Sequence, residues 1–356
     1  MVDHRRGAAP LPVANLADSP LPILSVKDLR TYYYQDEGVV RAVDGASFDV
    51  YTGKTLGIVG ESGCGKSVTA RSILRIVEQT GRIESGSIVL RRTNSHGQMD
   101  ELDLTKLDAN SPLMRDIRGG EIALIFQEPM TSFSPYHTVG NQIIEAIRLH
   151  SDLSKREARD RAIELLRMVG IPRPERRIDE YSFQLSGGLR QRVMIAMALS
   201  SDPKILIADE PTTALDVTTQ AQILDLLRQL QDEKGLAIIL ITHDMGVIAE
   251  MADDVVVMYL GRVVEQGPVE TIFHAPKHPY TRALLRSIPS ILAEPRTKLA
   301  TISGAIPHPY NRPTGCPFHT RCAEFMRGTC DVQTPTLQPI GPDHQVSCFL
   351  YQSQVV

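Results

Sequence analysis

A glycine-rich segment, GESGCGKS at residues 60–67, constrains this chain more than any other part of its sequence. It fits the pattern GxxxxGK[ST] at every fixed position. The apolar run TLGIV at residues 55–59 predicts a buried strand before it, and helical spacing follows it. In that setting the glycines let backbone amides surround phosphate groups, and the helix N-terminus adds positive potential. The segment therefore predicts a phosphate-binding loop in which Lys66 reaches the β- and γ-phosphates and Ser67 ligates Mg²⁺.

A second apolar run, KILIADE at residues 204–210, ends in two carboxylates. An acid at the C-terminal end of a parallel strand lies at the crevice where such sheets bind ligands. We expect Asp209 to hold Mg²⁺ and Glu210 to orient and polarise the attacking water. Together with the phosphate loop, this pair of carboxylates favours a nucleotide hydrolase.

The segment TKLD at residues 105–108 raises the alternative of a GTPase, because it matches the guanine-reading pattern [NT]KxD. That pattern normally closes a hydrophobic strand. Here it lies in the polar stretch DELDLTKLDANSP, which is typical of a turn. We interpret the match as chance.

The segment LSGGLRQR at residues 185–192 resembles the signature motif of ATP-binding cassette (ABC) ATPases, normally LSGGQ. It departs from that motif at Leu189 and keeps Ser186, Gly187 and Gly188. Physically, it is a second anion-binding helix N-terminus on one chain. In the family, two subunits dimerise head to tail, and the signature of one closes on the ATP held by the other. The resemblance therefore implies a second ABC ATPase subunit as a partner, most simply in a heterodimer.

Other positions match the family in order along the chain. Gln127 matches the glutamine that reports Mg²⁺ and γ-phosphate to the membrane partner, Asp216 matches the residue that contacts the opposite subunit, and His243 matches the switch histidine. The family also stacks an aromatic residue on adenine, and strand register favours Tyr33 over Tyr32 and Tyr34. The residues predicted to bind ATP are Tyr33, Gly60, Glu61, Ser62, Gly63, Cys64, Gly65, Lys66, Ser67, Val68, Gln127, Ser186, Gly187, Gly188 and Asp216. The predicted catalytic residues are Glu210 and His243, and the predicted Mg²⁺ ligands are Ser67, Gln127 and Asp209.

The resemblance implies an α/β fold: a P-loop ABC nucleotide-binding domain with a RecA-like core, an antiparallel β subdomain, an α-helical subdomain and a Cys-containing C-terminal extension. We expect a flexible leader at residues 1–21, the ATPase domain at 22–285 with its helical subdomain at 128–190, and the extension at 286–356. SKRE at residues 154–157 predicts a capping box, and Gly170 a helix end. The charges of KREARDR predict a solvated helix face, and the spacing of Ile223, Leu227 and Leu230 predicts a buried helix.

Net charge and hydropathy argue against general binding to nucleic acid or lipid and against a membrane span. The net charge of −4 gives no general attraction to nucleic acid or anionic lipid. No apolar run approaches the ~20 residues of a membrane span, and the N-terminus lacks the apolar region of a signal peptide. One contiguous cassette without a coiled-coil insert favours a transporter subunit over the DNA-repair and translation members of the family.

The C-terminal part of the sequence indicates which kind of transporter the chain would belong to. HPYTRALL at residues 278–285 and GCPFHTRC at 315–322 resemble the C-terminal extension of oligopeptide/dipeptide/nickel-type importer ATPases. The resemblance implies an ATP-hydrolysing subunit that powers solute import, most simply of peptides. Its partners would be a second ATPase, two transmembrane permeases and an extracytoplasmic solute-binding protein, and it would meet the cytoplasmic face of the cell membrane through the permeases only. Nickel chelates and oligosaccharides remain alternative solutes, and a soluble regulatory or nucleic-acid-associated ATPase remains the alternative class.

Four of the five cysteines, Cys316, Cys322, Cys330 and Cys348, lie in the extension. Four thiolates suffice for a [4Fe–4S] cluster, and some relatives in this transporter group carry one at the corresponding extension. Structural zinc also accepts four cysteines but favours CxxC pairs, which are lacking here. Four reduced thiols are the third interpretation. We favour the cluster among the three. The Gly- and Pro-rich surroundings could barely build a core alone, which favours a bound metal of either kind over free thiols.

Overall fold

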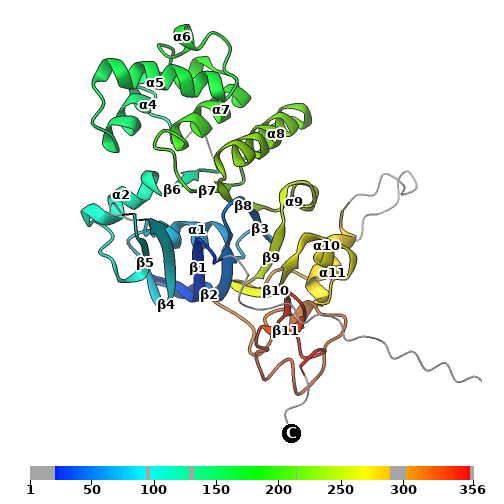
Figure 1. The fold of residues 1–356 in the computed structure, drawn as a ribbon. Coiled ribbons are helices and arrows are strands. Elements are labelled where there is room, and N and C mark those ends of the chain that lie inside the picture. Colours follow the sequence, from blue (N-terminus) through cyan, green and yellow to red (C-terminus); the bar gives the residue numbers. More distant parts are fainter. Residues whose placement is uncertain (1–20, 94–96, 128–131, 214, 289–301, 353–356) are drawn as a thin grey trace, which may run out of the picture.

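A sheet that contains both parallel and antiparallel strands forms the centre of the described structure (Figure 1). The computed structural model describes residues 21–93, 97–127, 132–213, 215–288 and 302–352. The strand order is β11-β12-β10-β9-β3-β8-β7-β6, and the five strands from β9 to β6 run parallel. The parallel strands are β3 (Thr55–Val59), β6 (Ile122–Ile125), β7 (Ile205–Asp209), β8 (Ala237–Thr242) and β9 (Asp254–Tyr259). The antiparallel strands are β10 (Arg262–Pro268), β11 (Gln338–Gly341) and β12 (His344–Val346).

The β3, β7 and β8 strands are buried at every residue, as the continuous apolar runs in the sequence predicted. A parallel sheet covered on both faces needs such runs. Helices and the second sheet supply the cover. The helices nearest the sheet are α1 (Lys66–Ile73), α2 (Pro112–Gly120), α8 (Val217–Lys234), α9 (Met245–Met251), α10 (Val269–His274) and α11 (Pro279–Arg286).

The second sheet is fully antiparallel, in the order β2-β1-β4-β5. Its strands are β1 (Leu24–Gln35), β2 (Gly38–Val50), β4 (Gly81–Thr93) and β5 (Met99–Asp103). Alternate side chains of β1 are buried, which is the period expected of a half-covered strand. The predicted antiparallel β subdomain is therefore confirmed. The segment TKLD does not close a strand, since its first residues form the short 3₁₀ helix Leu104–Lys106, in agreement with its interpretation as chance.

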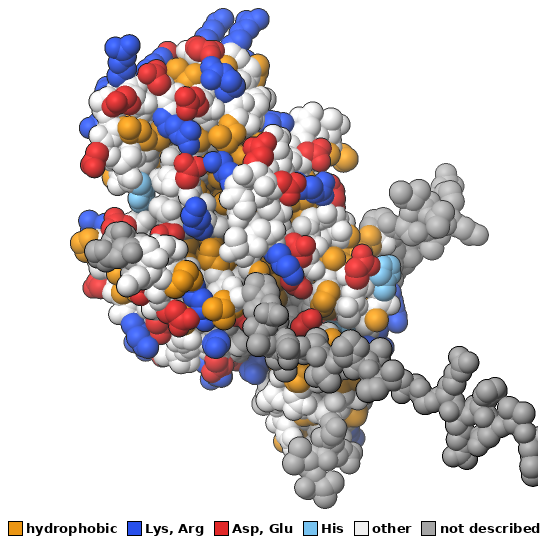
Figure 2. All heavy atoms as spheres, in the orientation of Figure 1, with side chains coloured by type: hydrophobic (Ala, Val, Ile, Leu, Met, Phe, Trp, Pro, Cys, Tyr) orange, Lys and Arg blue, Asp and Glu red, His pale blue; other side chains and the backbone are white. Residues whose placement is uncertain are grey.

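A lobe of helices stands apart from the sheets in Figure 1 and contains α4 (Val139–Leu149), α5 (Lys155–Met168), α6 (Pro174–Arg177) and α7 (Gly187–Ala198). The predicted capping box is confirmed, because Ser154 Oγ accepts a hydrogen bond from Glu157 N and the Glu157 carboxylate accepts one from Ser154 N. Gly170 follows α5 with φ 74°, as a C-terminal glycine should. Within KREARDR, Lys155, Arg156, Glu157 and Asp160 are exposed, which fits the predicted solvated face, and Figure 2 shows positive and negative side chains interspersed over this lobe.

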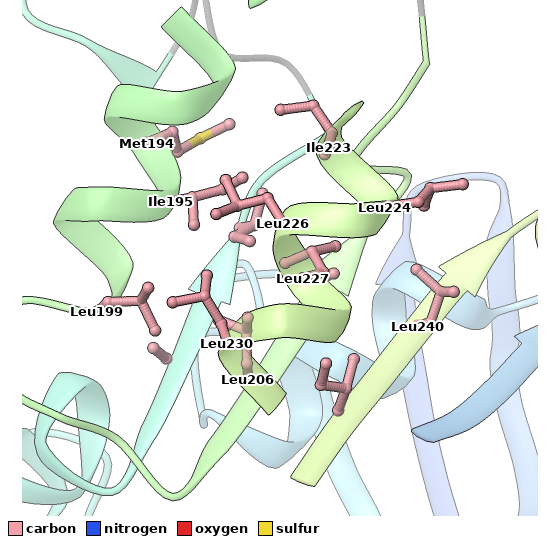
Figure 3. Close-up of a cluster of buried hydrophobic side chains, with 14 of the residues drawn as sticks. Met194, Ile195, Leu199, Leu206, Ile223, Leu224, Leu226, Leu227, Leu230 and Leu240 are labelled. Carbon is pink, nitrogen blue, oxygen red and sulfur yellow. The ribbon is translucent and has the colours of Figure 1, made fainter. Parts of the chain in front are cut away.

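The lobe is joined to the sheet through a single apolar core. Figure 3 shows α8 between α7 and the strands β7 and β8, with its leucines turned toward Met194, Ile195 and Leu199 on one side and toward Leu206 and Leu240 on the other. Ile223, Leu227 and Leu230 are at most 1 % exposed, so the buried helix predicted from their spacing is confirmed. Burying three such side chains contributes about 5–9 kcal/mol before the conformational entropy of the chain is subtracted.

The C-terminal segment continues the main sheet. Strand β12 pairs with β10 through Glu265↔Val346 and Gln266↔Gln345, and β11 forms the outer edge. Glu265 is completely buried, and its carboxylate accepts hydrogen bonds from the backbone amides of Lys277 (2.6 Å) and His278 (2.9 Å). The same carboxylate lies 2.9 Å from His344 Nε2. One buried acid therefore joins the start of α11 to the last strands of the chain.

The predicted leader, residues 1–21, lies outside the described residues except for Leu21, and the extension is described over residues 286–288 and 302–352. Within the part of the chain that the structure describes, no helix has the length and apolar character needed to span a membrane.

Acid should destabilise the protein through His278. Burial, with the charge of Arg282, lowers the pKa of His278 to about 3, and its Nδ1 accepts a hydrogen bond from Tyr280 N at the start of α11. An unfolded histidine titrates near pH 6.5, so the contribution of His278 is complete above that pH and is lost as the pH falls toward 3. Between pH 7 and pH 5 the loss is about 2 kcal/mol. In urea unfolding, His278→Asn, which keeps a capping acceptor without titrating, should lose about 2 kcal/mol less over this interval than the native protein.

His274→Asn, on an exposed turn of α10, is the matched control and should keep the native pH dependence of stability. Equal pH dependence in the native protein and in His278→Asn would contradict the assignment.

Candidate functional site

The phosphate loop lies between β3 and α1, as predicted, and two of its glycines are required by close backbone contacts. A Cβ at Gly65 (φ 102°) would lie 2.2 Å from Ala42 O of β2, and a Cβ at Gly60 (φ 152°) would lie 2.2 Å from Met258 O of β9. Lys66 is 5 % exposed, and its Nζ donates to Gly60 O at 2.7 Å. Strands β2 and β9 therefore hold the loop from two sides. The Lys66 side chain turns back and binds a backbone carbonyl of the same loop.

A cluster of polar side chains faces the loop from the C-terminal ends of β6, β7 and β8. Ser67 Oγ donates to Asp209 Oδ1 at 3.1 Å. Glu210 Oε2 accepts a hydrogen bond from Gln127 Nε2 at 3.1 Å, and Glu210 Oε1 lies 3.2 Å from His243 Nδ1. Since these strands are neighbours in a parallel sheet, their ends meet at one edge, as the argument from the sequence required.

Two features distinguish the carboxylates of this cluster. Burial raises the pKa of Asp209, and the Ser67 hydrogen bond opposes that shift. The hydroxyl and the carboxylate are hard oxygen donors of the kind that Mg²⁺ prefers, so this pair fits the predicted metal. Glu210 has a left-handed backbone (φ 49°), which costs free energy in a residue other than glycine and is found most often at functional sites.

A cavity of about 320 Å³ opens in front of the phosphate loop, within the range of roughly 300–1,000 Å³ typical of ligand pockets. Of the residues predicted to bind ATP, those that line this cavity are Ser62, Gly63, Gly65, Lys66, Ser67, Val68 and Gln127. Glu210 lines it too. Cys64 is 3 % exposed, and burial raises the pKa of its thiol, so it serves as a packing residue of the loop.

The predicted signature lies elsewhere in the molecule. Ser186 caps α7, and its Oγ accepts a hydrogen bond from Leu189 N at 3.4 Å. Gly188 packs against Thr219, where a Cβ would lie 2.6 Å from the threonine methyl. None of residues 186–188 lines the nucleotide cavity, and α7 is in the helical lobe whereas α1 lies beside the strands (Figure 1). Asp216 caps α8 through Thr219 N (2.9 Å) and is likewise outside the cavity.

The structure places Tyr33 outside this cavity, and its stacking on adenine stays a prediction. Tyr33 is only 7 % exposed and does not line the cavity. Its ring packs on Gly81 of β4, where a Cβ would lie 2.7 Å from Tyr33 Cε1. Tyr33 is more buried than Tyr32 and Tyr34, in line with the alternation of side chains along a strand.

Sequence reasoning missed a link between the extension and the phosphate loop. Arg321 donates two hydrogen bonds to the Glu61 carboxylate, at 2.6 and 3.0 Å, and its side chain is 3 % exposed. The Tyr280 hydroxyl accepts a hydrogen bond from Glu61 N at 2.9 Å. The pair Glu61–Arg321 spans 260 positions of the sequence, and no local signal connects them.

The four cysteines of the extension line one small cavity together with Phe318. Burial is the main cause that raises the pKa of Cys316 to about 11 and that of Cys348 to about 12. The other thiols nearby act in the same direction. However, no group of three or more His, Cys, Asp or Glu side chains in the described part of the chain is arranged to hold a metal ion. The described residues therefore form no metal-binding group, although the four thiols line one cavity.

Comparison with known proteins agrees with the site. The family model described as "ABC transporter" matches residues 43–213, and the model described as "Oligopeptide/dipeptide transporter, C-terminal region" matches residues 264–330. The chain is 48% identical over 328 residues to the probable peptide ABC transporter ATP-binding protein y4tR of Sinorhizobium fredii, covering 92% of this chain and 94% of that protein. It is 47% identical over 333 residues to the oligopeptide transport ATP-binding protein AppD of Bacillus subtilis, covering 93% and 98%.

A solved structure is similar in fold: the dimeric post-hydrolysis state of the ATP-binding cassette MJ0796 bound to ADP and Pi, with a TM-score of 0.60 and 27% identity. The match covers 69% of this chain and 98% of that one. The fold and the site are thus those of an ATP-hydrolysing cassette. This chain belongs to the ABC transporter family, as one of its ATP-binding proteins with an oligopeptide/dipeptide-type C-terminal region.

Gly65→Ala should weaken ATP binding in a folded protein. The new Cβ would meet Ala42 O at 2.2 Å and displace the loop, and strain of about 1–3 kcal/mol corresponds to a loss of about five- to 150-fold in affinity. Isothermal titration with Mg-ATP measures the loss.

Gly53→Ala is the matched control, because Gly53 also has a positive φ (70°) but nothing within 4 Å of a Cβ. It should bind ATP as the native protein does. Native affinity in Gly65→Ala would show that the loop does not depend on this backbone contact.

Proposed function

We propose that this chain is the ATP-hydrolysing subunit of an importer that moves peptides across the cell membrane. The observation that carries the proposal is the convergence of the phosphate loop with Gln127, Asp209, Glu210 and His243 in one chain that also has the oligopeptide/dipeptide-type C-terminal region. The relatives named above are described as peptide and oligopeptide transport proteins, which favours transport over a soluble regulatory ATPase and peptides over nickel chelates or oligosaccharides.

The roles of the site residues follow from their contacts. Amides of residues 60–67 and the Lys66 ammonium bind the phosphates of ATP. Ser67 and Asp209, with Gln127, would hold Mg²⁺, which neutralises charge on the phosphates when bound. Glu210 accepts the hydrogen bond of Gln127 and lies beside His243, so its carboxylate is held at the cavity, where it orients a water and receives its proton.

The position of the signature supports a partner subunit. Ser186, Gly187 and Gly188 present a helix N-terminus, and they do so outside the cavity of their own chain. A second ATPase subunit, arranged head to tail, would place its phosphates against them, with Asp216 at the same interface. We further propose two permeases and an extracytoplasmic binding protein as partners, and attachment of this chain to the cytoplasmic face of the membrane through the permeases. The domain limits proposed are 22–285 for the ATPase domain, 128–190 for its helical subdomain and 286–356 for the extension.

Glu210→Gln should bind Mg-ATP normally and lose turnover by about 10²- to 10⁴-fold, because the amide cannot receive the proton of the attacking water. ATP hydrolysis by the assembled transporter measures the loss. In cells that lack the native chain, the variant should also fail to restore uptake of a radiolabelled peptide.

Glu233→Gln, at an exposed carboxylate on α8 that accepts a hydrogen bond from Gln229, is the matched control and should hydrolyse ATP and restore uptake. Undiminished hydrolysis in Glu210→Gln would refute its role. Normal peptide uptake in cells without the chain would refute peptide import as its function.

The [4Fe–4S] cluster remains a proposal for the extension, supported by the four thiols that share one cavity. Thiolates are the ligands such a cluster takes, and the raised pKa of these thiols is a cost that bound iron would offset. Anaerobically purified protein should contain about four irons and four acid-labile sulfides per chain, with broad visible absorption.

Cys322→Ser should lose iron, sulfide and absorption together, whereas Cys64→Ser, a buried cysteine of the phosphate loop, should keep them. One zinc per chain would replace the cluster with a structural zinc site. Absence of both metals would leave four reduced thiols.

A further inference from the structure

The nucleotide cavity has two chemically different ends. At one end Gln127 and Glu210 hydrogen-bond to each other beside Ser67, which marks the side of the γ-phosphate and Mg²⁺. The lining on the β2 side of the loop, called the second end below, comes from Val40 and Ala42 of β2 and from Gly261 after β9, and the last two pack against Gly65. Because the loop fixes the phosphates, the nucleoside of a bound nucleotide has to lie toward this second end.

The second end is completed by the C-terminal extension. His308, Pro309 and Arg312 line the same cavity as Lys66 and Ser67. They lie more than 240 positions after the loop in the sequence, in the part that follows α11. The extension therefore forms one wall of the cavity, in addition to its contact with the loop through Arg321 and Glu61.

The segment that carries His308 is fastened to β1 and β2 at several points. The Tyr310 hydroxyl donates to the Gln35 side chain, and the Tyr310 ring lies 3.4 Å from the position of a Cβ at Gly38. The Tyr310 backbone N–H donates to His308 Nδ1 at 3.4 Å, with the two rings 5.3 Å apart. His308 is thus held over the cavity by a neighbour that is itself anchored to the β1–β2 turn.

Arg312 anchors the other end of this segment. Its Nη1 lies 3.0 Å from Asp44 Oδ2, in a buried cluster where Asp44 also meets Arg262 (3.1 Å) and Arg30 (3.4 Å). Of these groups Arg312 lines the cavity, and the Asp44 cluster holds it there. Both terminal nitrogens of Arg312 are buried without a well-formed hydrogen bond.

The tyrosine rings of β1 do not line the second end of the cavity. Tyr33 packs on Gly81, Tyr32 donates to Asp44, and Tyr34 donates to Glu84. None of these three rings lines the cavity. Within the described part of the chain, the ring that does is the imidazole of His308.

We propose that the extension forms the nucleoside end of the ATP site, with His308 stacking on the base and Arg312 positioning the segment that carries it. The proposal rests on the proposed function, since it requires that ATP binds at residues 60–67. It gives the extension a direct part in nucleotide affinity. A flat ring recognises any base by its π-face, so selectivity among bases should be low.

Isothermal titration of the full chain, in a Glu210→Gln background that prevents hydrolysis, tests the proposal with Mg-ATP and with magnesium triphosphate, which has no base. Stacking on one base is worth a factor of about 5–150 in affinity. His308→Ala should weaken Mg-ATP binding by about tenfold and leave triphosphate binding unchanged. His308→Phe should restore the affinity for Mg-ATP, and His274→Ala, an exposed histidine on α10, should change neither ligand.

Native Mg-ATP affinity in His308→Ala would overturn the proposal, and so would equal weakening of Mg-ATP and triphosphate, which would show an effect on the loop itself. Lys66→Ala separates this failure from failure of the proposed function. If Lys66→Ala loses both ligands while His308→Ala loses neither, the phosphate loop binds ATP and only the role of the extension is refuted. If Lys66→Ala binds both ligands normally, the ATP site itself is misplaced.

Discussion

The contact between the phosphate loop and the strands beside it determines the rest of the site. Gly60 and Gly65 allow the loop to touch the carbonyls of Met258 and Ala42, at positions that no Cβ could share. The loop is thereby clamped between β9 and β2, which belong to different sheets. This contact fixes where the phosphates bind, and it brings the antiparallel sheet to the edge of the nucleotide cavity.

Long-range polar pairs then attach the extension to that clamp. Glu61 is bound by Arg321 and Asp44 by Arg312, and the Glu265 carboxylate lies 2.9 Å from His344 Nε2. Each pair joins an acid in the first three quarters of the chain to a residue of the extension. Removing either arginine would leave its carboxylate without that partner, which is far more costly than the pair itself is stabilising. The extension is therefore built into the nucleotide site and continues its sheet.

Local patterns in the sequence predicted the parts of the site that local structure positions. A loop between a strand and a helix, or a carboxylate at the end of an apolar run, has its place set by its immediate neighbours, and Lys66, Asp209 and Glu210 are where such patterns put them. The capping box at Ser154 was predictable for the same reason. For Tyr33, alternation along a strand tells which side chains share a face but not what packs against them. Its ring packs on Gly81 of β4, the residue that pairs with it on the neighbouring strand.

The sequence by itself determined that this chain binds and hydrolyses a nucleotide triphosphate, since each group required for that chemistry is encoded in a short segment with its own strand or helix. Only the tertiary structure decided what surrounds the nucleotide. His308 and Arg312 carry no pattern that marks them, and they line the cavity as part of an extension whose strand β12 pairs with β10. Arg321 lies in a segment that the sequence marked, but nothing in that segment predicted its contact with Glu61. The physical reason is that buried ion pairs and strand pairing act between residues far apart in sequence, whereas periodicity reports only on neighbours.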